Sequence, residues 1–380
     1  MNWKTIPIFL AFLCMGFADA VGPFVGLAKE SFNLSNAMAQ MLPFMGFIMF
    51  GLLSIPAGIL QDKVGKKKIL ILGLFVALLG LIFPTFFGMN SYPVFLSTVM
   101  FIGAGASILQ VAGNPIMRDV SVEGKYSRNL SIAQFVKAIG SLSGPAIPAA
   151  AAYIWKGDWR IVFPIYAASL LLTLLTVAFL KVKEEESTSQ AATFASCFSL
   201  LKNRFVLMMV FGIFVYVGAE VCMSSQIPLY LKEKFGIDIQ TMGMLGTGLF
   251  FIALTIGRFL GGVILNWMAP KKFFILTCVV SIIGIALLFF SLETLAIPAV
   301  LLTGFGFANI FPLVFSITVD SMPTRSNELS GLMVTAICGG ALVPLLMGVV
   351  TDLTTSLFGF LVPMAAILYI SWTALIVRQK

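Results

Sequence analysis

The sequence has no histidine and little charge. Of its 380 residues, 11% are Asp, Glu, Lys or Arg, whereas soluble domains carry about 25%. Without histidine the chain cannot build a histidine-based zinc site or a histidine proton relay. The five cysteines are scattered and form no Cys-x-x-Cys pair, so we interpret them as packing residues rather than as disulfides or metal ligands. These shortages argue against an enzyme, which would need clustered catalytic groups.

Apolar residues are abundant instead, at 59% of the chain with a mean hydropathy of +1.02. Apolar windows of about 20 residues, separated by polar breaks, predict an all-α membrane protein of twelve transmembrane helices. The first window lacks a signal-peptide cleavage pattern, so we expect it to be retained. The predicted spans are 5–28, 37–61, 68–89, 92–117, 129–154, 160–181, 204–231, 240–265, 271–291, 294–319, 328–351 and 355–377.

The basic residues predict the orientation in the membrane. With the N-terminus inside, 17 of the 24 Lys and Arg fall on the inner side, five fall on the outer side, and Lys137 and Arg258 lie within spans. Basic residues favour the cytoplasmic side, so we expect both termini in the cytoplasm and the protein in a bacterial-type inner membrane. The net charge of +8 is explained by these loops and gives no reason to expect nucleic-acid binding. We expect a monomer whose partners are a small solute and the lipid bilayer.

The longest hydrophilic break, KVKEEESTSQAATFASCFSLLKNR at 181–204, divides the spans six and six. It predicts an N-terminal six-helix bundle over 1–182, a cytoplasmic linker over 183–203 and a C-terminal six-helix bundle over 204–380. An internal repeat supports this division, because NLSIAQFVKAIGS (129–141) and ELSGLMVTAICGG (328–340) share Leu-Ser, Ala-Ile and Gly. GILQDKVGKKK (58–68) likewise has a degenerate counterpart in GVILNWMAPKK (262–272). Repeated halves predict a transporter with its site between them.

The segment GILQDKVGKKK resembles the major facilitator superfamily signature between the second and third spans. We expect Gly58 to permit close helix approach, Asp62 to accept from helix amides or a basic partner, and Gly65 to turn the chain. Lys66 and the lysines after it would contact the inner leaflet. Asp62 and these lysines are the predicted inner gate.

Three further segments narrow the family: FIGAGASILQVAGNPIM (101–117), YVGAEVCMSSQIP (216–228) and FANIFPLVFSI (307–317). Together with GLMVTAICGGALVPLLMGVVTD (331–352) they resemble the fucose:proton symporter family, which includes bacterial glucose/galactose transporters. The resemblance covers nearly the whole chain. It implies uptake of a monosaccharide coupled to a cation, H⁺ or Na⁺, with no other cofactor.

Three positions depart from the family pattern. Asp19 in GFADAVGPFV lies about one helical turn before the place where the family carries an acid in its first span. Gln110 stands where the family has a proton-carrying glutamate, and Lys137 stands where it has an asparagine. One negative charge is therefore lost and one positive charge gained, so coupling through the usual glutamate does not carry over. These changes would also suit an anionic solute such as a sugar acid.

Two acidic residues and one basic residue are the main candidates within the spans. Intramembrane carboxylates are costly and usually mark ion or substrate paths, so Asp19 and Glu220 are predicted to take part in cation coupling, and Glu220 also to bind substrate hydroxyls. Lys137 has three interpretations: it reaches the inner interface, it is a counter-ion for Asp19, or it binds an anion.

The remaining candidates are amides and one arginine. Amides donate and accept hydrogen bonds, as sugar recognition requires, although they also join helices. Arg258 is expected to serve gating or structural pairing. The amides predicted to bind substrate are Gln110, Asn114, Gln134, Gln226 and Asn309. We therefore predict a secondary transporter that imports a monosaccharide or sugar derivative by alternating access; the alternatives are a carrier of an anionic solute and an efflux antiporter for amphipathic compounds.

Overall fold

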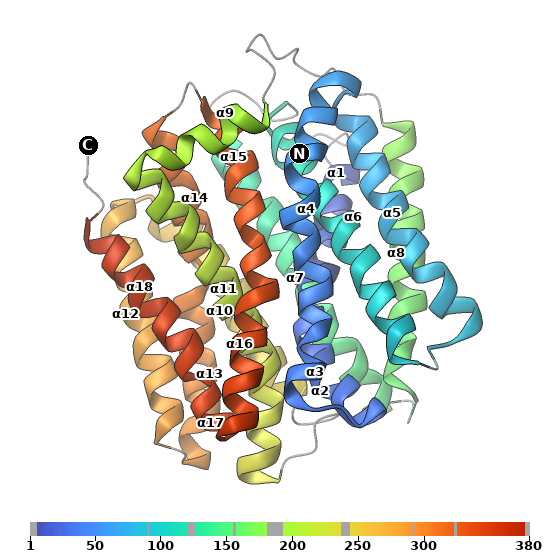
Figure 1. Cartoon of the computed structure of the whole chain (residues 1–380), viewed down its shortest axis with the longest axis vertical. Coiled ribbons are helices and arrows are strands. Elements are labelled where there is room, and N and C mark those ends of the chain that lie inside the picture. The colour runs from blue at the N-terminus through green and yellow to red at the C-terminus, as the bar shows by residue number, and fades with distance from the viewer. Residues whose placement is uncertain are drawn as a thin grey trace.

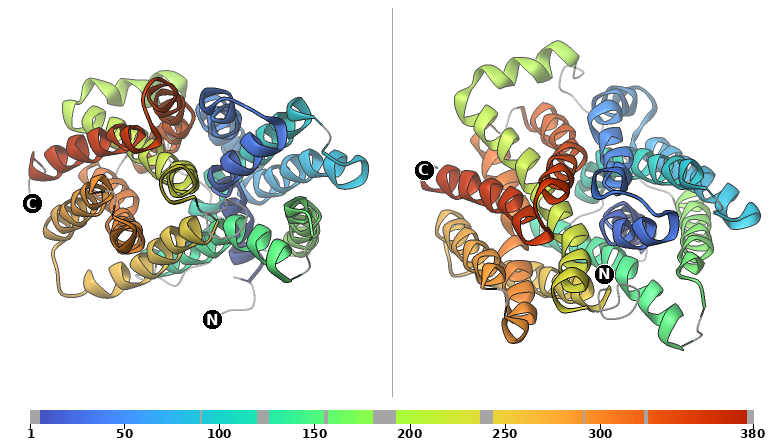
Figure 2. Two further views of the ribbon diagram at one scale, coloured as in Figure 1. Left: turned by 90° about the horizontal axis from the view of Figure 1, so that it is seen from below. Right: turned by 60° about the horizontal axis from the view of Figure 1, so that its bottom comes forward.

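The computed structural model describes the chain except residues 1–5, 90, 120–125, 155–156, 181–192, 237–243, 291, 323–324 and 377–380. Within the described residues the protein is helical and contains no strand. The helices form two groups side by side (Figures 1 and 2). The first group contains α1 (Ile6–Met15), η2 (Gly16–Ala18), α2 (Val21–Phe32), α3 (Asn36–Ala39), α4 (Met41–Val64), α5 (Lys66–Phe87), α6 (Tyr92–Asp119), α7 (Tyr126–Ile154), η3 (Trp159–Ile161) and α8 (Val162–Phe179). The second group contains α9 (Phe194–Ser199), η4 (Leu200–Lys202), α10 (Arg204–Phe235), α11 (Met244–Ile264), α12 (Pro270–Phe289), α13 (Glu293–Phe307), α14 (Ile310–Ser321), α15 (Ser326–Thr335), η7 (Ala336–Cys338), α16 (Gly339–Leu353), α17 (Ser356–Gly359) and α18 (Leu361–Ile376).

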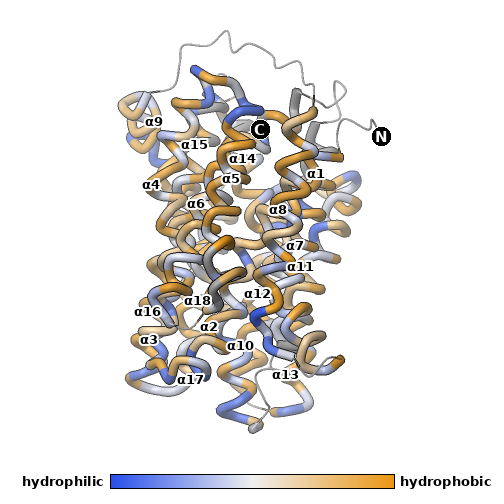
Figure 3. Tube along the Cα trace, turned by 90° about the vertical axis from the view of Figure 1, so that its right-hand side faces the viewer, coloured by the Kyte–Doolittle hydropathy of each residue, from blue (hydrophilic) through white to orange (hydrophobic). Residues whose placement is uncertain are grey.

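Hydropathy along the described chain matches a membrane protein. Eleven helical segments are long and apolar enough to cross a bilayer. The predicted fifth span corresponds to α7, which has 29 residues and contains Gln134, Lys137 and two prolines, and it is not among the eleven. Hydrophilic residues gather toward the two ends of the molecule and apolar residues lie between them (Figure 3). This pattern confirms the all-α membrane fold.

The first span is interrupted near its middle. Helix α1 passes into the 3₁₀ turn η2, and α2 begins only at Val21, which leaves Asp19 and Ala20 between the two. Close approach to α7 accompanies the break, because a Cβ on Gly16 would lie 2.2 Å from the carbonyl oxygen of Lys137. Glycine therefore lets the two backbones meet, and Asp19 is held beside α7.

The two groups repeat the same glycine contact. A Cβ on Gly140 would lie 2.1 Å from the carbonyl oxygen of Leu13, and a Cβ on Gly339 would lie 1.8 Å from that of Phe214. Gly140 and Gly339 correspond in the sequence repeat, and Leu13 and Phe214 are also separated by roughly 200 residues. The repeat seen in the sequence is therefore also a repeat of helix packing.

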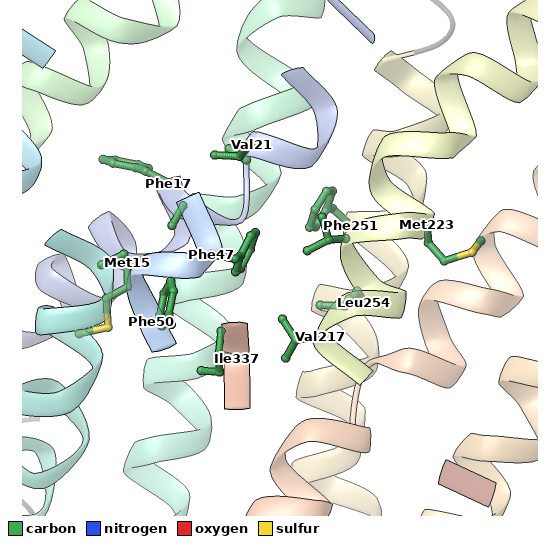
Figure 4. Packing of buried hydrophobic residues seen from close by; sticks show 14 of the residues in the cluster. Met15, Phe17, Val21, Phe47, Phe50, Val217, Met223, Phe251, Leu254 and Ile337 are labelled. Atoms are coloured by element: carbon green, nitrogen blue, oxygen red, sulfur yellow. The ribbon is translucent and has the colours of Figure 1, made fainter. Parts of the chain in front are cut away.

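Buried apolar side chains form a cluster that continues from one group into the other. Figure 4 shows Phe47 of α4 and Phe251 of α11 in the space between the groups. Phe47 also packs closely on α16, since a Cβ on Gly340 would lie 2.7 Å from its ring. The apolar interface between the groups thus surrounds the few charged side chains described next.

Candidate functional site

Asp19 lies in the interruption between η2 and α2 and faces α7. The Lys137 ammonium is 3.2 Å from Asp19 Oδ2, and the side chains are only 12% and 17% exposed. Ser141, one turn after Lys137, donates a 2.7 Å hydrogen bond to the same oxygen. Of the three interpretations of Lys137, the structure shows the ion pair with Asp19.

Glu220 forms a second ion pair in the other group. Arg258 Nη2 lies 3.3 Å from Glu220 Oε1, and these side chains are 10% and 15% exposed. The Arg258 Nε also donates to the Ala308 carbonyl at 3.4 Å, at the turn between α13 and α14. Arg258 is therefore held at two points, and the structure places it in structural pairing with Glu220.

Asp19 and Glu220 line the same small cavity between the two groups. Its volume is about 20 Å³, and its wall also includes Phe47, Ser224 and Phe251. A cavity of this size holds about one water molecule. Asp19 and Glu220 come from corresponding spans of the repeat, in Ala-Asp and Ala-Glu. Each half of the molecule thus contributes one carboxylate to the cavity and one cation to neutralise it.

Three predicted amides lie on α6 and α7. Gln110 is 5% exposed, and its Oε1 has no hydrogen-bond partner within the described part of the chain. Asn114 follows one turn later on α6 and is partly buried. Gln134 is also partly buried, one turn before Lys137 on α7. None of the three lines the cavity between Asp19 and Glu220.

Gln226 and Asn309 join helices in this structure. The Gln226 amide donates to Thr351 Oγ1 at 3.1 Å and to the Ser356 carbonyl at 2.7 Å, which ties α10 to α16 and α17. The Asn309 amide, in the turn between α13 and α14, donates to the Gly257 carbonyl of α11 at 2.7 Å. These bonds give each amide a packing role in the structure.

The predicted inner gate lies between α4 and α5. Gly65 has φ of +92°, a value that favours glycine, so it turns the chain as expected. The close approach expected at Gly58 is not seen among the described residues, where a Cβ would meet only Val111 at an ordinary 3.8 Å. The side chain of Asp62 lies outside the described residues. Lys66 begins α5.

Polar contacts join the two groups at the end near α3 and α17, away from the N and C marks in Figure 1. Asp352 accepts hydrogen bonds from Asn36 Nδ2 at 2.6 Å and from the backbone amides of Asn36 and Ala37 at 3.1 and 2.9 Å. Lys232 of α10 pairs with Glu30 of α2. We call the contacts of Asp352 and Lys232 the outer contacts. They hold α2 and α3 against α10 and α16.

Sequence analysis missed several residues of this site. Ser141 could have been found, because it lies four positions after Lys137 and therefore on the same helical face. Ser224, Phe47 and Phe251 gave no such signal, since one apolar or hydroxyl residue among many in a span does not reveal which way it faces. The outer contacts were also missed, because the sequence of one loop does not determine where a distant loop lies in the fold.

Comparison with known proteins agrees with this architecture. The model of the Major Facilitator Superfamily matches residues 8–344. A glucose/galactose transporter of Brucella abortus is 27% identical, over 97% of this chain and 92% of its own. A putative glucose/galactose transporter of Helicobacter pylori (strain J99) is 29% identical, over 96% of this chain and 94% of the relative. The L-fucose-proton symporter of Escherichia coli is 24% identical, over 85% of this chain and 81% of the relative. The crystal structure of the E. coli fucose:proton symporter matches with a TM-score of 0.73 and 23% identity, covering 100% of both chains. Because this family model covers most of the chain, the chain belongs to the major facilitator superfamily of transporters.

Proposed function

We propose that this protein imports a neutral monosaccharide or a close derivative by alternating access, coupled to H⁺ or Na⁺. The observation that carries the proposal is the cavity between the two helix groups, where Asp19 from one group and Glu220 from the other line the same wall. A site at the junction of the repeats is where a transporter of this architecture binds its solute.

The chemistry of the cavity suits a sugar. Ionised carboxylates accept hydrogen bonds only, so Asp19 and Glu220 can each receive donors from sugar hydroxyls, and Ser224 can donate or accept. Phe47 and Phe251 offer apolar ring faces beside them. Similarity to proteins named glucose/galactose transporters supports the same substrate class.

The charge balance favours a neutral solute over a sugar acid. Lys137 and Arg258 are each within 3.3 Å of a carboxylate, so the four charges cancel in pairs. An anion would have to compete with a carboxylate for either cation. The cation-coupling role falls to Asp19 and Glu220, whose ion pairs a bound H⁺ or Na⁺ would disturb.

The size of the cavity requires motion. Small-molecule pockets are commonly about 300–1,000 Å³, far larger than the 20 Å³ between Asp19 and Glu220. A sugar can therefore enter only when the two groups move apart. We propose that they rock as two bundles, 1–182 and 204–380. The outer contacts would open to admit solute, and the 58–68 segment would act as the gate at the inner end. The basic loops favour cytoplasmic termini and an inner-membrane location, and nothing in this mechanism needs more than a monomer.

Counterflow in proteoliposomes tests the proposal. Vesicles are preloaded with an unlabelled hexose, fucose or sugar acid, and uptake of the labelled compound is followed without an ion gradient. We expect uptake of a neutral sugar, lost in Asp19→Asn and Glu220→Gln and retained in Glu293→Gln, whose exposed carboxylate lies at the start of α13. Uptake of sugar acids alone would make Lys137 or Arg258 the substrate's partner, and no counterflow of any of them would favour efflux of amphipathic compounds.

Coupling is tested separately by imposing a pH or Na⁺ gradient on the same vesicles. We expect one of the two gradients to drive accumulation of the sugar above its external concentration. Counterflow that is present but insensitive to both gradients would identify a uniporter and remove the coupling role from Asp19 and Glu220.

A further inference from the structure

A second crevice lies away from the site between the two groups. It has a volume of about 130 Å³ and lies between α11, α12 and the α13–α14 turn. An apolar cavity of about 150 Å³ accommodates benzene, so there is room for several methylene groups of a chain. We propose that this crevice binds one acyl chain of an anionic phospholipid whose phosphate is held by Lys271 and Lys272.

The lining offers nothing to a polar ligand. Leu260, Leu276 and Phe305 are among its apolar residues. The polar groups in the wall are already engaged, because the Asn309 amide donates to Gly257 and the Thr277 hydroxyl donates to the Phe274 carbonyl. The occupant must therefore be apolar along the length of the crevice.

The crevice opens toward lipid. Leu260 and Leu276 line it and are 42% and 44% exposed. The lining stretch of α12 ends at Val280, ten residues after Pro270, and a helix rises about 1.5 Å per residue. The crevice thus extends about 15 Å from the end of α12, which is half of a hydrocarbon core of about 30 Å. A single leaflet supplies a chain at that depth.

Basic side chains lie where the headgroup of that chain would be. Lys271 and Lys272 begin α12 immediately before Phe273, which lines the crevice; Lys272 is exposed and Lys271 is half-buried. The positive charge is complementary to a phosphate and not to a zwitterionic headgroup with no net charge. On the proposed orientation this is the cytoplasmic leaflet, where anionic lipids are enriched.

The occupied crevice would support the site between the groups. Gly257 and Asn309 line the crevice, while the adjacent Arg258 pairs with Glu220 and bonds the Ala308 carbonyl. A lipid chain packed on Gly257 and Asn309 therefore buttresses the backbone that positions Arg258.

Native mass spectrometry of the purified, delipidated protein tests lipid binding independently of transport. Phosphatidylglycerol and phosphatidylcholine with identical chains are added back in separate titrations. We expect one phosphatidylglycerol to bind with a preference of about 30-fold, as two basic residues near an anionic headgroup supply. Equal retention of the two lipids would overturn the proposal.

Two matched pairs of variants locate the site. Leu276→Trp places a large ring at the mouth and should remove the tightly bound lipid. Leu172→Trp changes a leucine of α8 that is more exposed, at 58% against 44% for Leu276, and lies at a similar distance from the helix end, and it should not remove the lipid. Lys271→Gln with Lys272→Gln should abolish the preference for phosphatidylglycerol. As the control, Lys202→Gln with Arg204→Gln removes two basic residues at the end of η4 and the start of α10. This variant should keep the preference for phosphatidylglycerol. Equal effects within either pair would show that binding is not at this crevice.

Discussion

Replacing Lys137 by methionine tests the buried ion pair directly. Methionine keeps most of the length of the lysine stem but removes the ammonium that lies 3.2 Å from Asp19 Oδ2. Of the two described contacts of its carboxylate, Asp19 would keep the Ser141 hydrogen bond. Breaking a buried ion pair by removing one partner costs about 3–5 kcal/mol. Because the two side chains retain 12% and 17% exposure, we expect the free energy of unfolding to fall by an amount near the lower limit, about 3 kcal/mol.

The double variant separates pairing from packing. Asp19→Asn alone leaves the Lys137 charge buried without its partner and should destabilise by a similar amount. Asp19→Asn with Lys137→Met removes both charges, so its loss should be smaller than the sum of the single losses. The difference, the coupling energy, should be about 2–3 kcal/mol, as for contacting residues in one network.

Thermal unfolding in detergent, followed with a thiol-reactive dye, measures these effects. The assay suits this protein because Cys14, Cys197, Cys222 and Cys278 are buried when folded and react only on unfolding. A Lys137→Met protein that unfolds at the wild-type temperature would refute the pairing and indicate that Lys137 reaches the membrane surface instead. A double variant whose loss of stability equals the sum of the two single losses would also refute the pairing.

Three other predictions use different parts of the molecule. Glu220→Gln should abolish accumulation of sugar against a gradient, measured in energised vesicles; full retention would remove its coupling role. Gly140→Leu should fail to give folded protein in size-exclusion chromatography because its Cβ would lie 2.1 Å from a backbone carbonyl, whereas Gly262→Leu, with open space within 4 Å, should fold; equal folding of both would contradict the packing. Cys197 is 3% exposed, and burial raises the pKa of its thiol above the ordinary value, with a further rise from the Glu328 carboxylate. Alkylation of Cys197 at neutral pH, followed by peptide mapping, should therefore be slow before unfolding and fast after it; equal rates would show that the thiol is accessible.

The architecture could be predicted from the sequence because each span depends on local composition. Apolar runs and the repeat need no knowledge of partners, so the predicted limits fall within a few residues of most observed helices, such as 204–231 against Arg204–Phe235. The interruption of the first span at Gly16–Ala18 was not predicted, because it depends on the approach of α7. Hydropathy does not report which backbone a glycine meets.

The charged residues could be selected from the sequence, but their partners could not. Asp19, Lys137, Glu220 and Arg258 stand out because charge within a span is costly. Pairing depends on how each helix is rotated and how deep it sits in the membrane, and neither follows from the composition of a span. Gln226 was a substrate candidate for the same reason, since an amide that joins helices and one that binds sugar look alike in sequence.

The two ion pairs are arranged so that the halves can separate without separating buried charges. Asp19 and Glu220 correspond in the repeat, yet their cations do not: Ala336 corresponds to Lys137, and Ser54 to Arg258. Each carboxylate is instead neutralised from within its own half. The outer contacts that do cross between the halves are exposed, with the Lys232 side chain at 52%, and exposed ion pairs cost only about 0–1 kcal/mol to break. In the proposed rocking motion, the ion pair and hydrogen bonds broken at the outer end would therefore be weak ones, and both buried ion pairs would stay intact.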